Sequence, residues 1–503
     1  MRICLVIPPS IFLLDERVFM NLGILRVAAV LERAGVEIEM LDLSGIENYE
    51  EVAALHAQNS KASLFALTST TPQMPASTKI VWAMRKVRPS AKFLLGGPHI
   101  TLVNAAYRKE MKKGIQGRAV AAFERCKEIF DILIAGDGEE AIFIVLENPS
   151  VSFIDADDPA TPLFLTNSKL NELPFPARHL VDVSTYHYSI DGVPALSIIA
   201  QLGCPFGCGF CGGRESPMLR RVRTRTSENV VKEIVEMHRR YNINGFMFYD
   251  DELNVNPKMV ELMNLIQKTQ EDLRVEFRLR GFIKSQLFTD EQARAMYRAG
   301  FRWILVGFES GSSKILKNIN KQATCDENTR CIEIAKRHGL KVKALMSVGH
   351  PGESRETILD THRWLLETKP DDFDVTVITT YPGTPYYDYA QKYASKEKIW
   401  VYTCPENGDK LYSEEVDYTL IADYYKGDPN GGYKSFVYTE ALSPKALVEL
   451  RDFVERDVRE KLEIPFNPSG TSLRYEHSMG QAGLPLSILR TTGKPQISSS
   501  RLD

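Results

Sequence analysis

Three of the eight cysteines in this 503-residue chain stand within eight positions of one glycine-rich stretch, GCPFGCGFCGG at 203–213. Three residues separate Cys204 from Cys208, and two separate Cys208 from Cys211. Thiolates this close together suit a soft metal ion or an iron–sulfur cluster. A closed structural zinc site needs a fourth cysteine or histidine at a similar spacing, and none lies nearby. We therefore predict a 4Fe–4S cluster on three protein ligands, with one iron open to a substrate or cofactor; the competing interpretation is buried or zinc-binding cysteines.

The composition excludes several other classes of protein. Hydrophobic residues make up 44% of the chain and charged residues 25%, which is ordinary for a soluble protein. The net charge of −3 does not indicate a nucleic-acid partner. No apolar run reaches the roughly 18 residues that a membrane span needs. The start of the chain, MRICLVIPPS, favours a strand over a signal peptide.

The other five cysteines are scattered without the spacing of a disulfide framework, which is typical of a reducing compartment. We expect a cytoplasmic protein on this ground. The five are Cys4, Cys126, Cys325, Cys331 and Cys404.

The elements upstream of the cysteines must form a separate domain. Short β-rich runs alternate with amphipathic stretches from the N-terminus to about residue 145, among them a helical pattern at 22–35 that Gly35 closes. A polar helical insertion covers about 104–129. This alternation predicts a Rossmann-like, doubly wound parallel sheet over 1–145. The stretch 146–189 has scattered prolines and little periodicity, so we interpret it as a linker.

A second alternating series positions the cysteines. It predicts a partial six-stranded β/α barrel over 190–390, with chemistry at the carboxyl ends of the strands. The cysteines follow the first of these strands directly. The strands are predicted at 197–201, 245–250, 274–280, 302–308, 341–348 and 373–379, and the helices near 227–241, 257–270, 290–299, 312–320, 325–338 and 355–367.

The last part of the chain changes character. Residues 381–438 hold 12 of the 20 tyrosines. A helix begins after Ser443, a good N-cap, with Pro444 in its first position. We predict a small, mostly helical cap region at 391–466. The tail at 467–503 is rich in Ser, Thr, Gly and Pro, and we predict that it is disordered.

The cysteine stretch resembles the CxxxCxΦC signature of the radical S-adenosylmethionine (SAM) superfamily, in which Phe210 takes the aromatic position. The resemblance implies that SAM chelates the open iron through its amino and carboxylate groups. It further implies that an electron from the cluster cleaves SAM to a 5′-deoxyadenosyl radical, which abstracts hydrogen from unreactive carbon. An external one-electron reductant of the flavodoxin or ferredoxin type is then a necessary partner.

Other stretches occupy positions at which this superfamily contacts SAM. YDDE at 249–252 stands where a Gly-Gly-Glu motif holds the SAM amino group, although the glycines are absent here. GFESG and SVGHPGES end the fourth and fifth predicted strands. For each stretch the alternative is ordinary turn chemistry and helix capping. The implied SAM contacts are Phe210, Asp250, Asp251, Glu252, Glu309, Ser310 and Gly349.

The N-terminal domain resembles the cobalamin-binding domain that precedes the barrel in many radical SAM proteins. Glycine-rich and hydroxyl-rich loops at strand ends allow close backbone approach to a large planar ligand. The motif that supplies an axial histidine to cobalt elsewhere is absent, so the lower face of the corrin is expected to be empty or to meet water or another residue. A Rossmann-like domain without a ligand is the alternative. The implied contacts are Ser69, Thr70, Gly96, Gly97, Gly136 and Gly138.

Three functions fit these parts. The first is a radical SAM methyltransferase that alkylates an unactivated carbon of a small molecule with two SAM and methylcobalamin. The second is a cobalamin-dependent cyclase, ring-rearrangement or oxidative enzyme without methyl transfer. The third is a cobalamin-binding regulator with a vestigial barrel, which the intact cysteine triad disfavours.

Two features bear on the substrate, whose identity the sequence does not reveal. The tyrosines of 381–438 are compatible with an aromatic substrate pocket, but ordinary packing is the simpler explanation. A basic run is compatible with an anionic substrate, but a solvated stretch before the helix at 227 is simpler. The run consists of Arg220, Arg221, Arg223 and Arg225.

Overall fold

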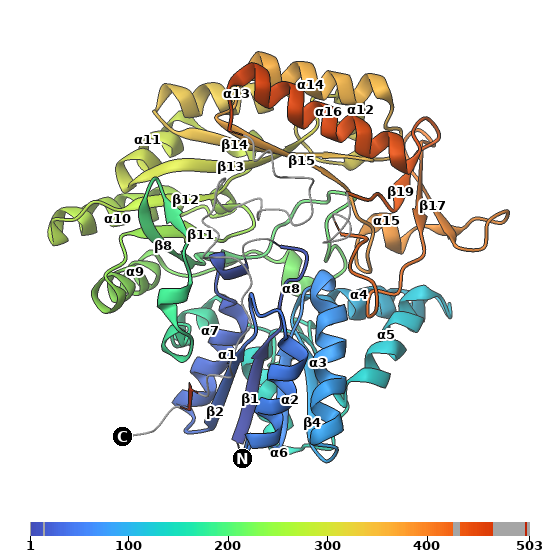
Figure 1. Ribbon diagram of the computed structural model, residues 1–503. Coiled ribbons are helices and arrows are strands. Elements are labelled where there is room, and N and C mark those ends of the chain that lie inside the picture. Colours follow the sequence, from blue (N-terminus) through green and yellow to red (C-terminus); the bar gives the residue numbers. More distant parts are fainter. Residues whose placement is uncertain (1, 14–15, 426–432, 466–497, 500–503) are drawn as a thin grey trace.

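The computed structural model describes residues 2–13, 16–425, 433–465 and 498–499. A parallel α/β domain forms the lower half of the molecule, and a curled sheet with outer helices forms the upper half (Figure 1). The predicted architecture of two successive α/β units is confirmed.

The N-terminal domain is built on six parallel strands in the order β2-β1-β3-β4-β5-β6. They are β1 (Arg2–Ile7), β2 (Glu37–Asp42), β3 (Leu64–Thr68), β4 (Lys92–Gly96), β5 (Ile132–Gly136) and β6 (Phe153–Ala156). The helices are α1 (Leu22–Arg33), α2 (Tyr49–Asn59), α3 (Met74–Val87), α4 (Pro98–Lys112), α5 (Arg118–Ile129) and α6 (Gly138–Glu147). The strand order reverses between β1 and β3, which places a ligand crevice at their carboxyl ends.

The segment 146–189 is more than the predicted linker. Its residues 153–156 form β6, which pairs in parallel with β5 and completes the sheet. The exit of β5 requires glycine, because Gly136 has φ +92° and a Cβ there would lie 2.3 Å from the carbonyl carbon of Ala156. A short helix, α7 (Asn167–Glu172), follows β6. The low periodicity of the segment hid a four-residue strand.

The second sheet contains six parallel strands, with β7 (Ser189–Ile190) antiparallel at one edge. The parallel strands are β8 (Val193–Ile198), β11 (Gly245–Phe248), β12 (Arg278–Phe282), β13 (Phe301–Glu309), β14 (Lys341–Val348) and β15 (Asp372–Val377). The outer helices are α9 (Ser227–Tyr241), α10 (Met259–Leu273), α11 (Asp290–Ala299), α12 (Ser313–Ile319), α13 (Cys325–Arg337) and α14 (Arg355–Thr368).

Two predicted strands are displaced along the sequence. The first begins at Val193, before the predicted start, and the third begins at Arg278, because Arg274 ends α10 in a left-handed conformation with φ +57°. The cysteine stretch follows a short hairpin of β9 (Gln201–Leu202) and β10 (Arg223–Thr224), with α8 (Pro217–Arg220) between them.

The C-terminal region is mixed, not mostly helical. An antiparallel sheet of β16 (Gln391–Lys392), β17 (Ile399–Thr403), β18 (Lys410–Glu414) and β19 (Val437–Tyr438) follows the short helix α15 (Pro385–Asp388). The predicted helix is α16 (Pro444–Leu462), capped by Ser443. Its polar side chains close the open edge of the barrel sheet: Glu455 accepts the Val375 N–H at 2.6 Å, and Arg451 donates to the Val375 carbonyl at 2.7 Å.

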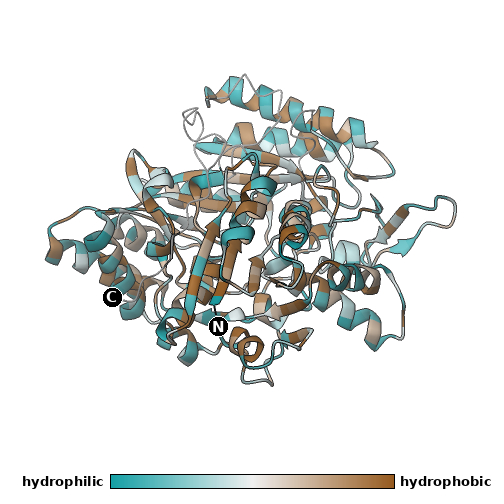
Figure 2. Cartoon of the chain, turned by 60° about the horizontal axis from the view of Figure 1, so that its bottom comes forward, coloured by the Kyte–Doolittle hydropathy of each residue, from teal (hydrophilic) through white to brown (hydrophobic). Residues whose placement is uncertain are grey.

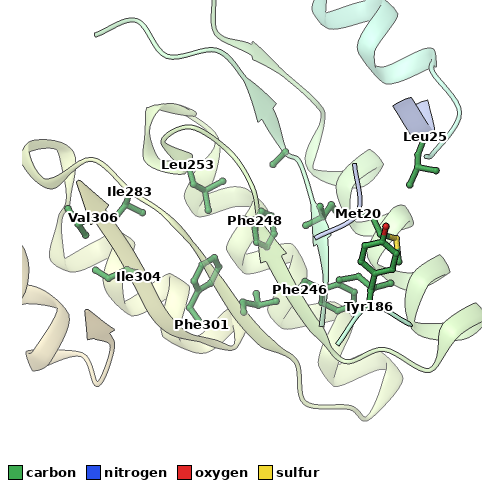
Figure 3. Close-up of a cluster of buried hydrophobic side chains, with 14 of the residues drawn as sticks. Met20, Leu25, Tyr186, Phe246, Phe248, Leu253, Ile283, Phe301, Ile304 and Val306 are labelled. Carbon is green, nitrogen blue, oxygen red and sulfur yellow. The ribbon is translucent and has the colours of Figure 1, made fainter. Parts of the chain in front are cut away.

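One hydrophobic core runs through both halves of the molecule. Apolar residues are concentrated on the strands and on the inner faces of the helices (Figure 2). Met20, Leu25 and Tyr186 belong to the same buried cluster as the barrel residue Phe246 (Figure 3). This shared core fixes the relative position of the two domains.

Polar contacts strengthen the junction between the domains. The fully buried Asp157 accepts the Ser216 hydroxyl and the Met218 N–H, both at 2.8 Å, and Arg108 pairs with it at 2.7 Å. The predicted disordered tail lies outside the described residues except for β20 (Ser498–Ser499), which pairs antiparallel with β2. Within the described ranges, no helix has the length and apolarity needed to cross a membrane.

Candidate functional site

The cysteine loop is held by backbone hydrogen bonds at both ends. The Cys204 N–H donates to the Leu219 carbonyl at 3.0 Å, and the Gly209 N–H donates to the Ile319 carbonyl at 2.7 Å. The Tyr386 N–H in turn donates to the Gly209 carbonyl at 3.1 Å. A Cβ at Gly209 would lie 2.3 Å from the Tyr386 ring, so this glycine is needed for close packing. The loop is therefore fixed by segments from three parts of the barrel.

The three thiols do not form a site for a single ion. Cys208 is buried, Cys204 is half-buried and Cys211 is exposed, and at least one pair of their ligand atoms lies more than 4.8 Å apart. A single zinc ion would bring all three sulfurs closer, because Zn–S bonds are about 2.3 Å long. The geometry disfavours the zinc alternative and fits a cluster, in which each cysteine binds a different iron. Burial raises the pKa of the Cys204 thiol to about 11, so metal binding must displace its proton.

Two of the three acidic side chains after β11 accept hydrogen bonds from the backbone where the chain enters the cysteine loop. The Asp250 carboxylate accepts the Ala200 N–H at 3.0 Å and also the Gln201 N–H, and Asp251 accepts the Gly203 N–H at 3.1 Å. Burial raises the pKa of Asp250 to about 7, against the opposing effect of these amides. Both residues were predicted to contact SAM, and the structure places them against the protein backbone.

Glu252 differs from its two neighbours. No hydrogen bond to its carboxylate is found among the described residues, and only its backbone carbonyl is engaged, by the Gln201 amide at 2.7 Å. Burial raises the pKa of Glu252 to about 7, although Lys321 and Lys284 lower it. Glu252 is therefore the member of the triplet whose carboxylate is available to a ligand.

A buried network of charged groups lies beside Glu252. Lys321 donates to Glu309 at 3.0 Å, and the Ser347 hydroxyl donates to the other Glu309 oxygen at 2.8 Å. The ammonium of Lys284 donates to the Lys321 carbonyl at 2.8 Å. Both lysines are at least 95% buried, and sequence reasoning missed both because neither belongs to a motif. The network fixes the Glu309 carboxylate at the end of β13.

Ser310 and Gly349 form hydrogen bonds directly after the ends of β13 and β14. The Ser310 hydroxyl accepts the Ser312 N–H at 3.1 Å and lies 3.1 Å from the Thr361 hydroxyl. The Gly349 N–H donates to Glu353 at 3.2 Å, and Gly349 has φ +93°. For Ser310 the structure thus shows a turn-forming hydrogen bond, which was part of the alternative to SAM contact.

The aromatic residue of the cysteine motif packs on a buried histidine that the sequence did not single out. The rings of Phe210 and His350 have centroids 5.4 Å apart. His350 bonds to Ser347 at 2.8 Å and to the Tyr386 hydroxyl at 3.3 Å. Burial lowers the pKa of His350 to about 3, so the ring is neutral at physiological pH. It joins the cysteine loop to Glu309 through Ser347.

A cavity of about 650 Å³ lies between the two domains, at the switch point of the first sheet. Five of the six predicted cobalamin contacts line it or its rim: Thr70, Gly96, Gly97, Gly136 and Gly138. The sixth, Ser69, is fully buried beneath it and bonds to Ser77 at 2.6 Å. The described lining contains no histidine, in agreement with the missing axial-ligand motif.

The glycines of this cavity have different structural roles. Gly97 has φ +89°, and a Cβ there would lie 2.4 Å from the Thr68 hydroxyl, so a side chain would displace the β3 loop. At Gly96 the nearest atom to a Cβ is 3.9 Å away. The backbone at Gly96 is thus open to a ligand that approaches closely, and the lining fits a large planar group.

The tyrosines and arginines separate into different environments. Of the 12 tyrosines at 381–438, Tyr381 and Tyr425 line the cavity and the other ten do not.

Arg223 pairs with Asp137 at 2.5 Å and Arg225 with Glu233 at 2.5 Å, and both are buried. These two arginines do not form the predicted solvated run. Arg220 and Arg221 lie at the surface beside the cysteine loop.

Comparison with known families agrees with both domains. Residues 16–127 match the B12 binding domain, and residues 198–365 match the radical SAM superfamily. The chain thus combines a B12-binding domain with a radical SAM domain, and enzymes of the radical SAM superfamily use a 4Fe–4S cluster and SAM.

Three relatives illustrate the range of this group. An uncharacterised methyltransferase from Pyrococcus horikoshii is 26% identical over 78% of this chain and 83% of its own length. The anaerobic magnesium-protoporphyrin IX monomethyl ester cyclase of Cereibacter sphaeroides is 23% identical over 83% of this chain, but the match covers only 63% of the cyclase. The radical SAM methyltransferase TsrM from Kitasatospora setae shares the fold, with a TM-score of 0.63, 16% identity, and 93% and 91% of the two chains covered.

The arrangement of the thiols predicts the effect of removing one. Cys208→Ala should lose most of the iron that the wild-type protein retains after anaerobic reconstitution, because a cluster on two ligands is not held. Iron analysis and the visible absorption of the cluster measure this loss. Cys325→Ala is the control, since Cys325 begins α13 and its thiol donates to the Gly311 carbonyl at 3.3 Å. Equal iron content in the two variants would contradict the assignment.

Proposed function

We propose that the protein is a cobalamin-dependent methyltransferase that alkylates an unactivated carbon of a small molecule. One observation carries the proposal: the cavity lined by the glycine loops of the first domain extends to barrel residues beside the cysteine loop, although none of the three cysteines or the predicted SAM contacts lines it. Tyr249 lines it and directly precedes the acids that hold the cysteine loop. Tyr381 lines it too, and its ring would lie 3.3 Å from a Cβ at Gly212, the neighbour of Cys211. A substrate in this cavity would lie between the cysteine loop and the glycine loops of the first domain.

Cys204, Cys208 and Cys211 would hold the cluster, and bound SAM would supply a carbon-centred radical. Glu252 would accept the SAM ammonium, because its carboxylate has no protein partner among the described residues. Glu309, fixed by Lys321 and Ser347, would accept hydroxyl groups of the ribose. Gly349 would admit the adenine to the backbone, and Phe210 would pack beside it. Asp250, Asp251 and Ser310 would hold the backbone that carries these contacts in place, without touching SAM themselves.

Cobalamin, when bound, supplies a transferable methyl group. Thr70, Gly96, Gly97, Gly136 and Gly138 would hold it by close backbone approach and by the threonine hydroxyl, while Ser69 supports the β3 loop from below. The walls of the cavity exclude water through apolar and aromatic side chains, which protects a radical from side reactions. These walls include Phe12, Phe19, Leu102, Met218, Tyr249, Tyr381 and Tyr425.

Methyl transfer is favoured over cyclisation by the fuller length match to the methyltransferase relative. The match covers 83% of the Pyrococcus methyltransferase but 63% of the cyclase. The cyclase is nevertheless a named relative, so a cyclase or rearrangement reaction is the second candidate. The regulator hypothesis lacks support, since the chain keeps all three cysteines and the buried network beside them.

The experiment that separates the first two candidates uses SAM with a deuterated methyl group. The reconstituted protein, with hydroxocobalamin and dithionite, is incubated with a small-molecule extract of the source cells. We expect a product that carries the labelled methyl, with one S-adenosylhomocysteine and one 5′-deoxyadenosine formed per product. An unlabelled product accompanied by 5′-deoxyadenosine alone would favour the cyclase candidate.

Cobalamin placement is tested at Gly96, where a side chain fits the fold but would enter the ligand space. Gly96→Leu should lower cobalamin occupancy by about tenfold or more through steric exclusion, with cluster absorption unchanged. Cobalamin retained after gel filtration measures occupancy. Gly97→Leu is a poorer variant, since φ +89° and the Thr68 contact would strain the backbone as well. Unchanged occupancy in Gly96→Leu would place the ligand elsewhere.

The pKa of Glu252 predicts how SAM affinity depends on pH. Its carboxyl group has a raised pKa of about 7 and must be ionised to accept an ammonium, so affinity should rise between pH 6 and pH 8. Glu252→Gln should weaken binding by about 1.5–3 kcal/mol, the range for hydrogen bonds to charged groups, and should flatten this rise. Equilibrium dialysis of SAM measures both effects. A variant with the wild-type pH profile would assign the ammonium to another residue.

A further inference from the structure

The outer side of the cysteine loop carries a group of basic side chains. Arg220 donates to the carbonyls of Phe206 and Pro205, the latter at 2.6 Å, and Arg214 donates to the Gly207 carbonyl. The backbone of Arg221 passes beside Gly203, since a Cβ there would lie 2.2 Å from the Arg221 carbonyl oxygen. Three arginines therefore surround residues 203–207.

A fourth basic residue comes from α12. Its C-cap Asn320 donates to the Gly207 carbonyl at 3.2 Å, and Lys317 lies one turn earlier with 72% of its side chain exposed. We call Arg214, Arg220, Arg221 and Lys317 the loop rim.

The arginine charges of the loop rim are not neutralised within the protein. Among the described residues, no carboxylate lies within 4.0 Å of the guanidinium groups of Arg214, Arg220 or Arg221. Two acids near the loop rim have basic partners: Glu406 lies 3.4 Å from Lys317, which belongs to the rim, and Glu215 lies 3.8 Å from Lys109. The three arginines thus make the loop rim a local positive surface on a chain whose net charge is −3.

The loop rim lies outside the cavity in which we place the substrate. None of its four residues lines the cavity between the domains. Its residues instead contact the outer side of the loop that holds Cys204 and Cys208, where Pro205 is exposed. A protein docked here would be separated from these two ligands by a single layer of backbone.

We propose that the loop rim is the docking surface of an acidic one-electron carrier protein. Reductive cleavage of SAM consumes one electron, so the carrier is oxidised by one electron for each cleavage, and no atom or proton crosses the interface. Electron transfer slows steeply with distance, which favours a surface against the cysteine loop. Opposite charge steers such partners and sets their orientation. The proposal rests on the radical SAM assignment and is independent of methyl transfer.

The test reverses two charges that do not hold the loop. The variant Arg221→Glu/Lys317→Glu leaves Arg214 and Arg220 on their carbonyls. The matched control, Arg239→Glu/Lys268→Glu, reverses two exposed basic residues on α9 and α10, away from the loop. Isothermal titration with an oxidised, acidic flavodoxin at low salt measures the Kd of the complex. We expect the Kd to rise by about tenfold or more in the rim variant, with little change in the control, and the difference to shrink at high salt.

A second measurement separates docking from damage to the cluster. Stopped-flow absorption follows cluster reduction, first by reduced flavodoxin and then by dithionite. Reduction by flavodoxin should slow by about tenfold in the rim variant, whereas reduction by dithionite should not change, since a small reductant needs no docking surface. Equal flavodoxin affinity in the rim and control variants would overturn the proposal. So would a parallel loss of dithionite reduction, which would show a damaged loop. Methyl transfer driven by dithionite tests the proposed function separately, because it needs no carrier protein.

Discussion

The candidate site depends on two neighbouring carboxylates, those of the buried Asp250 and the exposed Asp251, that hold backbone amides. Asp250 and Asp251, at the end of β11, accept the N–H groups of residues 200, 201 and 203, where the chain leaves β8. Without these acceptors the amides would be left unsatisfied in the interior, at a cost of about 1–3 kcal/mol each. The raised pKa of Asp250 shows that burial disfavours its charge and that the amides only partly compensate. The start of the cysteine loop is thereby tied to the neighbouring strand.

The other end of the loop is tied to the first domain. Asp157 follows β6 and binds Ser216 and Met218, which follow the cysteines, while Asp137 follows β5 and pairs with Arg223. The end of β5 also forms part of the cavity wall, through Gly136 and Asp137. A shift of the first domain would therefore move both the glycine loops and the segment after the cysteines. This coupling links the cavity of the first domain to the segment that follows the cysteines.

Most of the fold follows from periodicity, because long amphipathic helices and buried strands have strong patterns. The helices 227–241 and 290–299 and the strand 341–348 have the predicted bounds. Periodicity could not reveal β6, which has four residues, or the short strands that make the C-terminal region mixed. The basic run was misread in part because Arg223 and Arg225 find acids that lie 86 and eight residues away in sequence. Such pairing depends on the tertiary structure.

Motif matching located the strand ends of the SAM site but could not separate ligand contacts from structural ones. Asp250, Asp251 and Glu252 are adjacent and chemically alike, yet backbone amides engage only the first two side chains. Which carboxylate stays open is decided by where β8 passes, and one sequence does not encode that in any local pattern. Lys284 and Lys321 come from separate loops, so their proximity also depends on the tertiary structure and is not encoded in a local sequence pattern.

The charges of this buried network explain what kind of ligand completes it. Burial is the largest single effect on Lys321 and lowers its pKa, but Glu309, Cys208 and Glu252 together raise the pKa overall, so the charge of Lys321 is compensated within the protein. Glu252 and Lys284 are not matched in this way: burial raises the pKa of Glu252 to about 7 and lowers the pKa of Lys284. Each shift disfavours the charged form. A ligand that brings both an ammonium and a carboxylate would stabilise both charges at once, and the methionine part of SAM is such a zwitterion. Burial desolvates both groups before any ligand binds, so part of the desolvation cost of such a complex is met when the protein folds.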